Sequence, residues 1–335
     1  MCWCSQKITV TLHHRNKEFI SHPMINRTML RIRIVQMMFA YLKSDADSAR
    51  AVEKQLLQSF QDTYDLYFQL LLLPVEITRF AQQRIENAKS KYLPTDAERN
   101  PNMRFVENTF VAQLEKNVDL NFRIKENKRI SWNDNVEVIA ELYALIQESD
   151  IYKEYMAKPV VSYDDDKQMW RKLLTDVIIP NEAFCDALES MSIYWIGDLD
   201  SVASFVVKTI RRFQAENEYA QELLPMFADD EDREFAMIVL RDAIKHLDQY
   251  RKLIDEHANN WDVERLAYMD IVIMLVAVAE IMSVPTIPVS VTLNEYMEIA
   301  KEYSTEKSAS FINGVLDNIV KKLKSEKKLI KVALV

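Results

Sequence analysis

The stretch Ile271-Val-Ile-Met-Leu-Val-Ala-Val-Ala279 is apolar on every side, and it decides how the rest of the chain is interpreted. A surface helix keeps one polar face, so a helix of this composition must be wrapped by other elements. A membrane span needs about 20 apolar residues, and this run is much shorter, so we predict a buried core helix and no membrane crossing. The helix is expected over about 261–283 and is stopped by Pro285 and Pro288.

Two further helices are expected after these prolines. The first is predicted to open at Thr292, where Glu295 three residues later completes a capping-box pattern. The second follows a polar turn at 303–307 and carries an apolar stripe at helical spacing, formed by Ile312, Val315, Leu316, Ile319 and Leu323. Three helices in a row therefore organise this end of the chain.

Gly314 lies inside the last of these helices, in a chain that has only two glycines. Glycine costs about 1 kcal/mol relative to alanine in a helix interior, so we expect another backbone to approach closely at this position. Phe311 lies at the edge of the stripe, near the preceding turn. It is either a core residue or a partly exposed ring that contacts a base or a partner.

The composition indicates an all-α protein, long enough for one large or two ordinary domains. The 335 residues include two glycines and nine prolines, and 49% of them are hydrophobic. Because glycine is so scarce, neither a Rossmann GxGxxG loop nor a Walker loop can be built. No serine, cysteine or aspartate stands near a histidine in a recognisable nucleophile pattern, so we expect no enzyme and no cofactor.

The formal charge of −9 argues against general affinity for nucleic acid, so any such contact must come from local patches. Three cysteines and the lack of a long secretory apolar segment fit a reducing cytoplasm. Cys2 and Cys4 stand near three histidines, but a Cys-x-Cys pair lacks the spacing of a zinc site. We interpret residues 1–23 as a disordered or mis-called leader and expect no metal.

The first helix is predicted over 24–43, with an apolar stripe formed by Leu30, Ile34, Met37 and Tyr41. The same segment carries Arg27, Arg31, Arg33 and Lys43 and no acidic residue. These cations are either a solvated helix flank or a patch that contacts phosphate, because arginine forks match phosphate oxygens.

Residues 46–228 read as a series of further helices. They are expected at roughly 48–73, 75–92, 104–118, 134–156, 165–178, 181–193 and 199–218. Breaks are expected near Pro74 and Gly197, among other places. The triplet Asp164–Asp166 is interpreted as a helix N-terminus rather than a metal site, because acids there suit the helix dipole. Core positions are predicted for three tryptophans, namely Trp132, Trp170 and Trp195.

The C-terminal part resembles the NusB family of transcription antitermination factors. The order and spacing of these elements carry the resemblance: Trp261-Asp-Val-Glu-Arg265, Asp270 and Glu280, Pro285, Asn294-Glu295 with Ala300-Lys301, and Phe311-Ile-Asn-Gly-Val-Leu-Asp317. The resemblance implies an RNA-binding factor that pairs with the small-subunit ribosomal protein NusE on boxA-type nascent RNA. The pair would recruit other Nus factors to RNA polymerase and support ribosomal RNA transcription in the cytoplasm.

The resemblance also implies particular contact residues. NusB-like proteins begin with an arginine-rich helix, and Arg27, Arg31, Gln36 and Phe39 occupy matching places. RNA contact is expected from Arg27, Arg31, Arg33, Lys307, Ser308, Phe311 and Asn313. Contact with the basic ribosomal partner is expected from Glu264 and Asp270. The sequence departs from the family at Lys307, Leu275 and Ala279, where an acid, an arginine and a tyrosine are more usual.

The implied architecture is a NusB-type helical bundle with an additional helical insertion between the first and second family helices. Its expected divisions are a leader (1–23), the first family helix (24–45), the insertion (46–228), the remainder of the NusB-like domain (229–325) and a basic tail (326–335).

Two alternatives to an antitermination factor remain. An RNA-binding front end of a ribosomal RNA methyltransferase is disfavoured, because no glycine-rich cofactor domain follows. A helical protein–protein scaffold that has lost RNA binding stays open.

Overall fold

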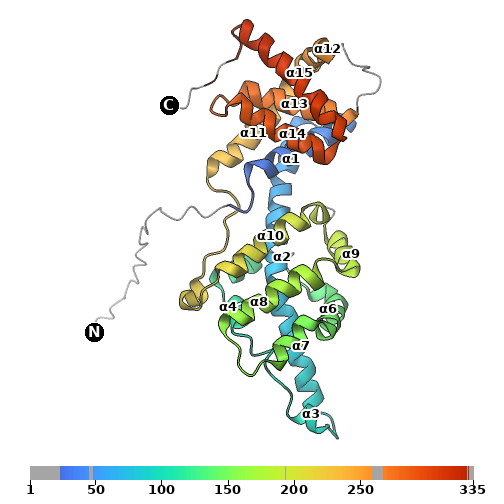
Figure 1. Cartoon of the computed structure of the whole chain (residues 1–335), viewed down its shortest axis with the longest axis vertical. Helices are drawn as coiled ribbons and strands as arrows, with labels where there is room; N and C mark the ends of the chain where they lie inside the picture. Colours follow the sequence, from blue (N-terminus) through green and yellow to red (C-terminus); the bar gives the residue numbers. More distant parts are fainter. Residues whose placement is uncertain (1–22, 45–47, 193, 259–266, 330, 332–335) are drawn as a thin grey trace, which may run out of the picture.

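The computed structural model describes residues 23–44, 48–192, 194–258, 267–329 and 331. Across these residues the chain forms helices and no strand, which confirms the all-α prediction. The helices gather into two groups, one at each end of an elongated molecule (Figure 1). A single long helix, α2 (Ala49–Lys89), runs from one group into the other.

The first group surrounds α13 (Tyr268–Ser283), in which every residue from Val272 to Ile281 is buried. The helices that contact it are α1 (Arg27–Lys43), α11 (Asp230–Lys245), α12 (Leu247–Ala258), α14 (Val289–Tyr303) and α15 (Glu306–Ser325). The prediction of a wrapped central helix is therefore confirmed. The Trp261–Arg265 element that precedes it lies outside the described residues.

The second group is built around the middle and far part of α2. It contains α3 (Asp96–Arg99), α4 (Thr109–Glu115), α5 (Val118–Glu126), α6 (Val136–Glu148), α7 (Asp150–Ala157), α8 (Tyr163–Leu173), α9 (Glu182–Met191) and α10 (Trp195–Arg212). Short 3-10 helices lie at η1 (Asn133–Asn135) and η3 (Ala215–Ala220), and η2 (Leu174–Ile178) is a π-helical segment that continues directly from α8. Helices α4, α5, α6 and α10 all pack on α2, and Trp132, Trp170 and Trp195 are buried as predicted.

The break expected near Pro74 is wrong, because Pro74 lies in the interior of the 41-residue helix α2. Proline removes one backbone hydrogen bond and costs about 3 kcal/mol in a helix interior. Here Pro74 is buried together with Leu73 and Val75, since helices of the second group cover this part of α2. Burial of a continuous apolar segment therefore outweighs the local preference for a break.

The break expected near Gly197 lies a few residues earlier, between the end of α9 at Met191 and the start of α10 at Trp195, and Gly197 itself lies in the first turn of α10. Another expected boundary is wrong. Helix α14 begins at Val289, one turn before the predicted start, so Thr292 is not its cap. Instead the Thr292 hydroxyl donates a hydrogen bond of 2.9 Å to Glu280 on α13, and the side chain is fully buried.

The acidic triplet lies in the first turn of α8, as predicted, where Asp165 and Ser162 form a capping box. Asp166 is not solvated, however. Its carboxylate is buried and accepts hydrogen bonds from Thr109 and Tyr155, so it joins α8 to α4 and α7.

Candidate nucleic-acid interface

The N-terminus of α1 is fixed by local bonds. Asn26 caps the helix by accepting a hydrogen bond of 2.9 Å from the backbone N–H of Met29. Just before it, the backbone N–H groups of Met24 and Ile25 donate to the carbonyl oxygens of Pro225 and Met226, both at 2.9 Å. The start of α1 is therefore tied to the segment that leads into α11.

Arg27 is the most exposed of the three arginines predicted to contact RNA, with 38% of its side chain exposed. Its Nε donates to Asp232 of α11 at 2.9 Å, and its guanidinium lies over the ring of Phe235, 5.2 Å from the centroid. Arginine has five N–H donors, so donors beyond Nε stay available to a phosphate. The role of Arg27 in RNA binding stays a prediction.

Arg31 lies inside the bundle, with 3% of its side chain exposed. Its Nε and Nη2 donate to the two carboxylate oxygens of Glu280 on α13, at 2.8 and 2.9 Å. Its Nη1 donates to Glu295 of α14 at 3.1 Å. The expectation that Arg31 contacts RNA is corrected, because its guanidinium is buried and hydrogen-bonded to Glu280 and Glu295, which holds α1 against α13 and α14.

The electrostatics of this network are consistent with a charged pair. Burial works to lower the pKa of Arg31, but the hydrogen bonds to Glu280 and the negative charges of Glu280 and Glu295 together outweigh it and raise the pKa. Glu280 also accepts hydrogen bonds from Thr292 and Tyr296, at 2.9 and 3.0 Å. Burial, together with the nearby Glu280, raises the pKa of Tyr296 well above its ordinary value, so its hydroxyl remains a donor.

Arg33 is also buried, and its expected RNA contact is corrected in the same way. Its Nη2 pairs with Asp198 of α10 and donates to the hydroxyl of Thr63 on α2 at 3.0 Å. Its Nη1 donates to Gln36 at 2.8 Å. Arg33 therefore ties the first helix to both α2 and α10 of the second group.

The start of α15 differs from the predicted surface. Phe311 is buried, with 5% of its surface exposed, so the expectation of a ring free to stack on a base is wrong. Ser308 is buried as well, because it belongs to the capping box that Thr305 forms at the helix start. Asn313 is exposed and stays a candidate, whereas the side chain of Lys307 lies outside what the structure describes.

Gly314 is exposed beside Asn313. A Cβ added at Gly314 would meet no atom within 4 Å apart from the neighbouring backbone of its own helix. The prediction that another backbone approaches closely here is therefore wrong, and the glycine lies in open space.

The acids predicted to face a basic partner do not form an exposed surface in the described residues. Asp270 is 3% exposed, and its carboxylate accepts a hydrogen bond of 2.5 Å from the hydroxyl of Ser304 beyond α14. Its expected partner contact is corrected because this bond joins α13 to the turn before α15. Glu264 lies outside the described residues. Leu275 and Ala279, which depart from the family pattern, are buried in the core.

A cavity of about 360 Å³ opens beside the start of α1, between this helix, α2, α10 and the end of α14. Its polar lining includes Asn26, Thr28, Arg33, Asp198 and Lys208. Sequence reasoning missed Lys208, which lies in α10, because no local pattern marks it. A cation near a helix N-terminus suits an anion, although Asp198 and Glu302 in the same lining oppose one.

Comparison with known proteins shows which family this helical bundle belongs to. The model of the NusB family matches residues 203–321. The transcription antitermination protein NusB of Koribacter versatilis is 41% identical over 100 residues, which are 30% of this chain and 68% of that protein. This chain belongs to the NusB family. The resemblance carried by the sequence motifs is thereby confirmed.

Other NusB relatives give the same result. The Salinibacter ruber protein is 34% identical over 106 residues, and the Finegoldia magna protein is 42% identical over 91 residues. These matches cover 32% and 27% of this chain, and 66% of each relative. The chain therefore spans about two thirds of the length of these relatives. No solved structure matches it.

The NusB match begins inside α10, covers α11, α12, α13 and α14 completely, and ends within α15. It includes Asp270, Ser308, Phe311 and Asn313, whereas the arginines of α1 precede it.

The matched relatives are named transcription antitermination proteins, which are not enzymes. In the described part of the chain, no helix is both long and apolar enough to span a bilayer. Within the same part, no three His, Cys, Asp or Glu side chains gather as a metal site requires.

Proposed function

We propose that this NusB-family protein is an RNA-binding transcription antitermination factor. It pairs with the small-subunit ribosomal protein NusE on boxA-type nascent RNA, and the complex brings other Nus factors to RNA polymerase in support of ribosomal RNA transcription. Family membership is the observation that carries this proposal.

The described surface supports a modest RNA contact rather than a strong one. Arg27 offers phosphate-binding donors at the start of α1, and Asn313 offers an amide on α15. The chain carries a formal charge of −9, so weak local contacts must overcome general repulsion of RNA. A basic partner would reduce that repulsion and extend the RNA-binding surface.

Fluorescence anisotropy of a labelled boxA RNA tests this proposal, with the protein alone, with NusE and with a scrambled RNA. Tighter binding to boxA than to the scrambled RNA is expected once NusE is present. Arg27→Ala and Asn313→Ala should each weaken this binding. Arg99→Ala is the matched control, because Arg99 is exposed on α3, in the second group of helices. Absence of sequence-dependent binding with NusE present would overturn the proposal.

The burial of Arg31, Arg33 and Phe311 favours a second candidate, a helical protein–protein scaffold that has lost RNA binding. Replacing all three arginines of α1 would not separate the two functions, because Arg31 and Arg33 hold the fold together. The separate variants of Arg27 and Asn313 discriminate instead. A scaffold would still bind NusE or another partner, but the anisotropy of the labelled boxA RNA would not exceed that of the scrambled RNA.

A further inference from the structure

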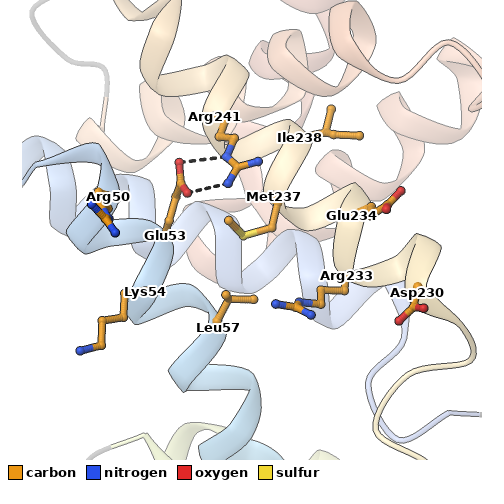
Figure 2. A pocket seen from close by; sticks show the side chains of 10 residues that line it. All are labelled: Arg50, Glu53, Lys54, Leu57, Asp230, Arg233, Glu234, Met237, Ile238 and Arg241. Atoms are coloured by element: carbon orange, nitrogen blue, oxygen red, sulfur yellow. Dashed lines mark hydrogen bonds and ion pairs between the residues drawn. The ribbon is translucent and has the colours of Figure 1, made fainter.

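A wide groove lies between the first turns of α2 and the outer face of α11, with a volume of about 860 Å³ (Figure 2). Helix α11 contributes residues from Asp230 to Arg241 at spacings of three and four, so they form one face of the helix. Helix α2 contributes residues from Arg50 to Leu57 at the same spacings. The groove is separate from the α1 and α15 surface considered above.

The charges in the groove are only partly paired. Arg241 donates from Nε and Nη2 to both carboxylate oxygens of Glu53, at 2.9 and 2.8 Å (Figure 2). The hydrogen bond from Arg241 lowers the pKa of Glu53, so this pair is charged and mutually satisfied. Arg50, Lys54 and Arg233 are exposed, and among the described residues they form no ion pair.

The floor of the groove is apolar and accessible. Leu57 and Met237 are half-buried between the two helices, and Ile238 is 44% exposed. Figure 2 shows Arg233 reaching toward Leu57, with Lys54 on the α2 side and the acids Asp230 and Glu234 on the opposite side. The apolar residues are therefore flanked by Arg50 and Lys54 on the α2 side and by the acids on the far side, and Arg233 reaches between the two helices.

We propose that this groove docks an amphipathic helix of a partner protein, with acidic residues along the flank that faces α2. Helices that bind in grooves insert apolar residues at spacings of three and four, and the apolar floor of the groove matches that pattern. The methionine adapts to side chains of different shape. The exposed cations supply charge complementarity in a chain that is otherwise strongly acidic.

RNA fits this groove less well. None of the residues that line it is aromatic, so bases have no ring on which to stack. Asp230 and Glu234 would repel a phosphate backbone along one side. A basic protein such as NusE would be repelled by Arg50, Lys54 and Arg233, so the occupant is a different partner. The inference does not depend on the proposed RNA-binding function.

The test uses the full-length protein and a fluorescein-labelled model peptide of about 18 residues, or about five helical turns, with leucines on one face and glutamates beside them. Control peptides carry lysine in place of glutamate, or the same residues in scrambled order. The glutamate peptide is expected to bind tighter than both controls. The double variant Lys54→Glu/Arg233→Glu should weaken its binding at least about tenfold, and Ile238→Ser should weaken it independently.

The matched control is Arg251→Glu/Lys252→Glu, which makes the same charge change on exposed positions of α12. This control should bind the glutamate peptide as the unchanged protein does, and circular dichroism verifies that every variant is folded. The proposal is overturned if the glutamate peptide binds no tighter than its controls, or equally well to the groove variant. It is also overturned if the groove variant loses single-stranded RNA binding but retains the peptide.

Discussion

Replacing Arg31 with alanine should destabilise the protein without removing a ligand contact. The change leaves the carboxylate of Glu280 fully buried, without either of its hydrogen bonds from arginine. Removing one partner of a buried ion pair costs about 3–5 kcal/mol, because the remaining charge is uncompensated. Glu280 keeps its hydrogen bonds from Thr292 and Tyr296, so we expect the lower end, about 3 kcal/mol.

Urea unfolding followed by circular dichroism measures this change in the free energy of unfolding. Arg79→Ala is the control, because Arg79 forms ion pairs with Glu76 and Glu115 but is 53% exposed. Exposed pairs contribute at most about 1 kcal/mol, so the control should unfold close to the unchanged protein. Folded Arg31→Ala should bind boxA RNA and NusE nearly as the unchanged protein does.

The contrary result is equally clear. If Arg31→Ala unfolded at the same urea concentration as the unchanged protein but lost RNA binding, Arg31 would contact RNA directly. The assignment of Arg31 to the buried network would then be refuted.

Three further predictions follow from other contacts. Gly314→Ala should stabilise the protein by about 0.5–1 kcal/mol, because the position is helical and open; a lower melting temperature would contradict this. Arg33→Ala should speed amide hydrogen exchange in the first turn of α10, since Asp198 loses its partner there; unchanged exchange would argue against the link. The hydrogen bond from Lys91 lowers the pKa of Glu98 to about 2. The stabilisation that Glu98 gives to the start of α3 is therefore complete above the ordinary pKa of 4.5 and is lost as pH falls through about 2. An NMR titration of the Glu98 side chain measures this, and an ordinary pKa would contradict the prediction.

Local patterns predicted the elements whose burial is continuous or periodic. The apolar run of α13 could only be a core helix, and the stripe of α15 requires a neighbour on one side. The family motifs lie in the same segment, so recognition and fold class were accessible from sequence. Pro74 was misjudged because packing from helices far along the chain, rather than local preference, keeps α2 continuous.

The site was harder to predict because exposure depends on distant partners. Nothing near Arg31 in sequence shows that Glu280, 249 residues later, meets its guanidinium. In the same way, Arg33 pairs inside the protein with Asp198, which lies 165 residues later in the chain. A basic stretch in an acidic chain therefore indicates charge, but only the folded structure separates internal ion pairs from groups open to solvent.

The continuity of α2 connects the second group of helices to the NusB bundle through one unbroken helix. At 1.5 Å per residue its 41 residues span about 60 Å, and its far end leads to the exposed side chains of Tyr92 and Leu93. One extra residue in α2 would turn everything beyond it by about 100° relative to the bundle. The length of this helix thus sets how far from the bundle Tyr92 and Leu93 lie and in which direction around the helix axis they point.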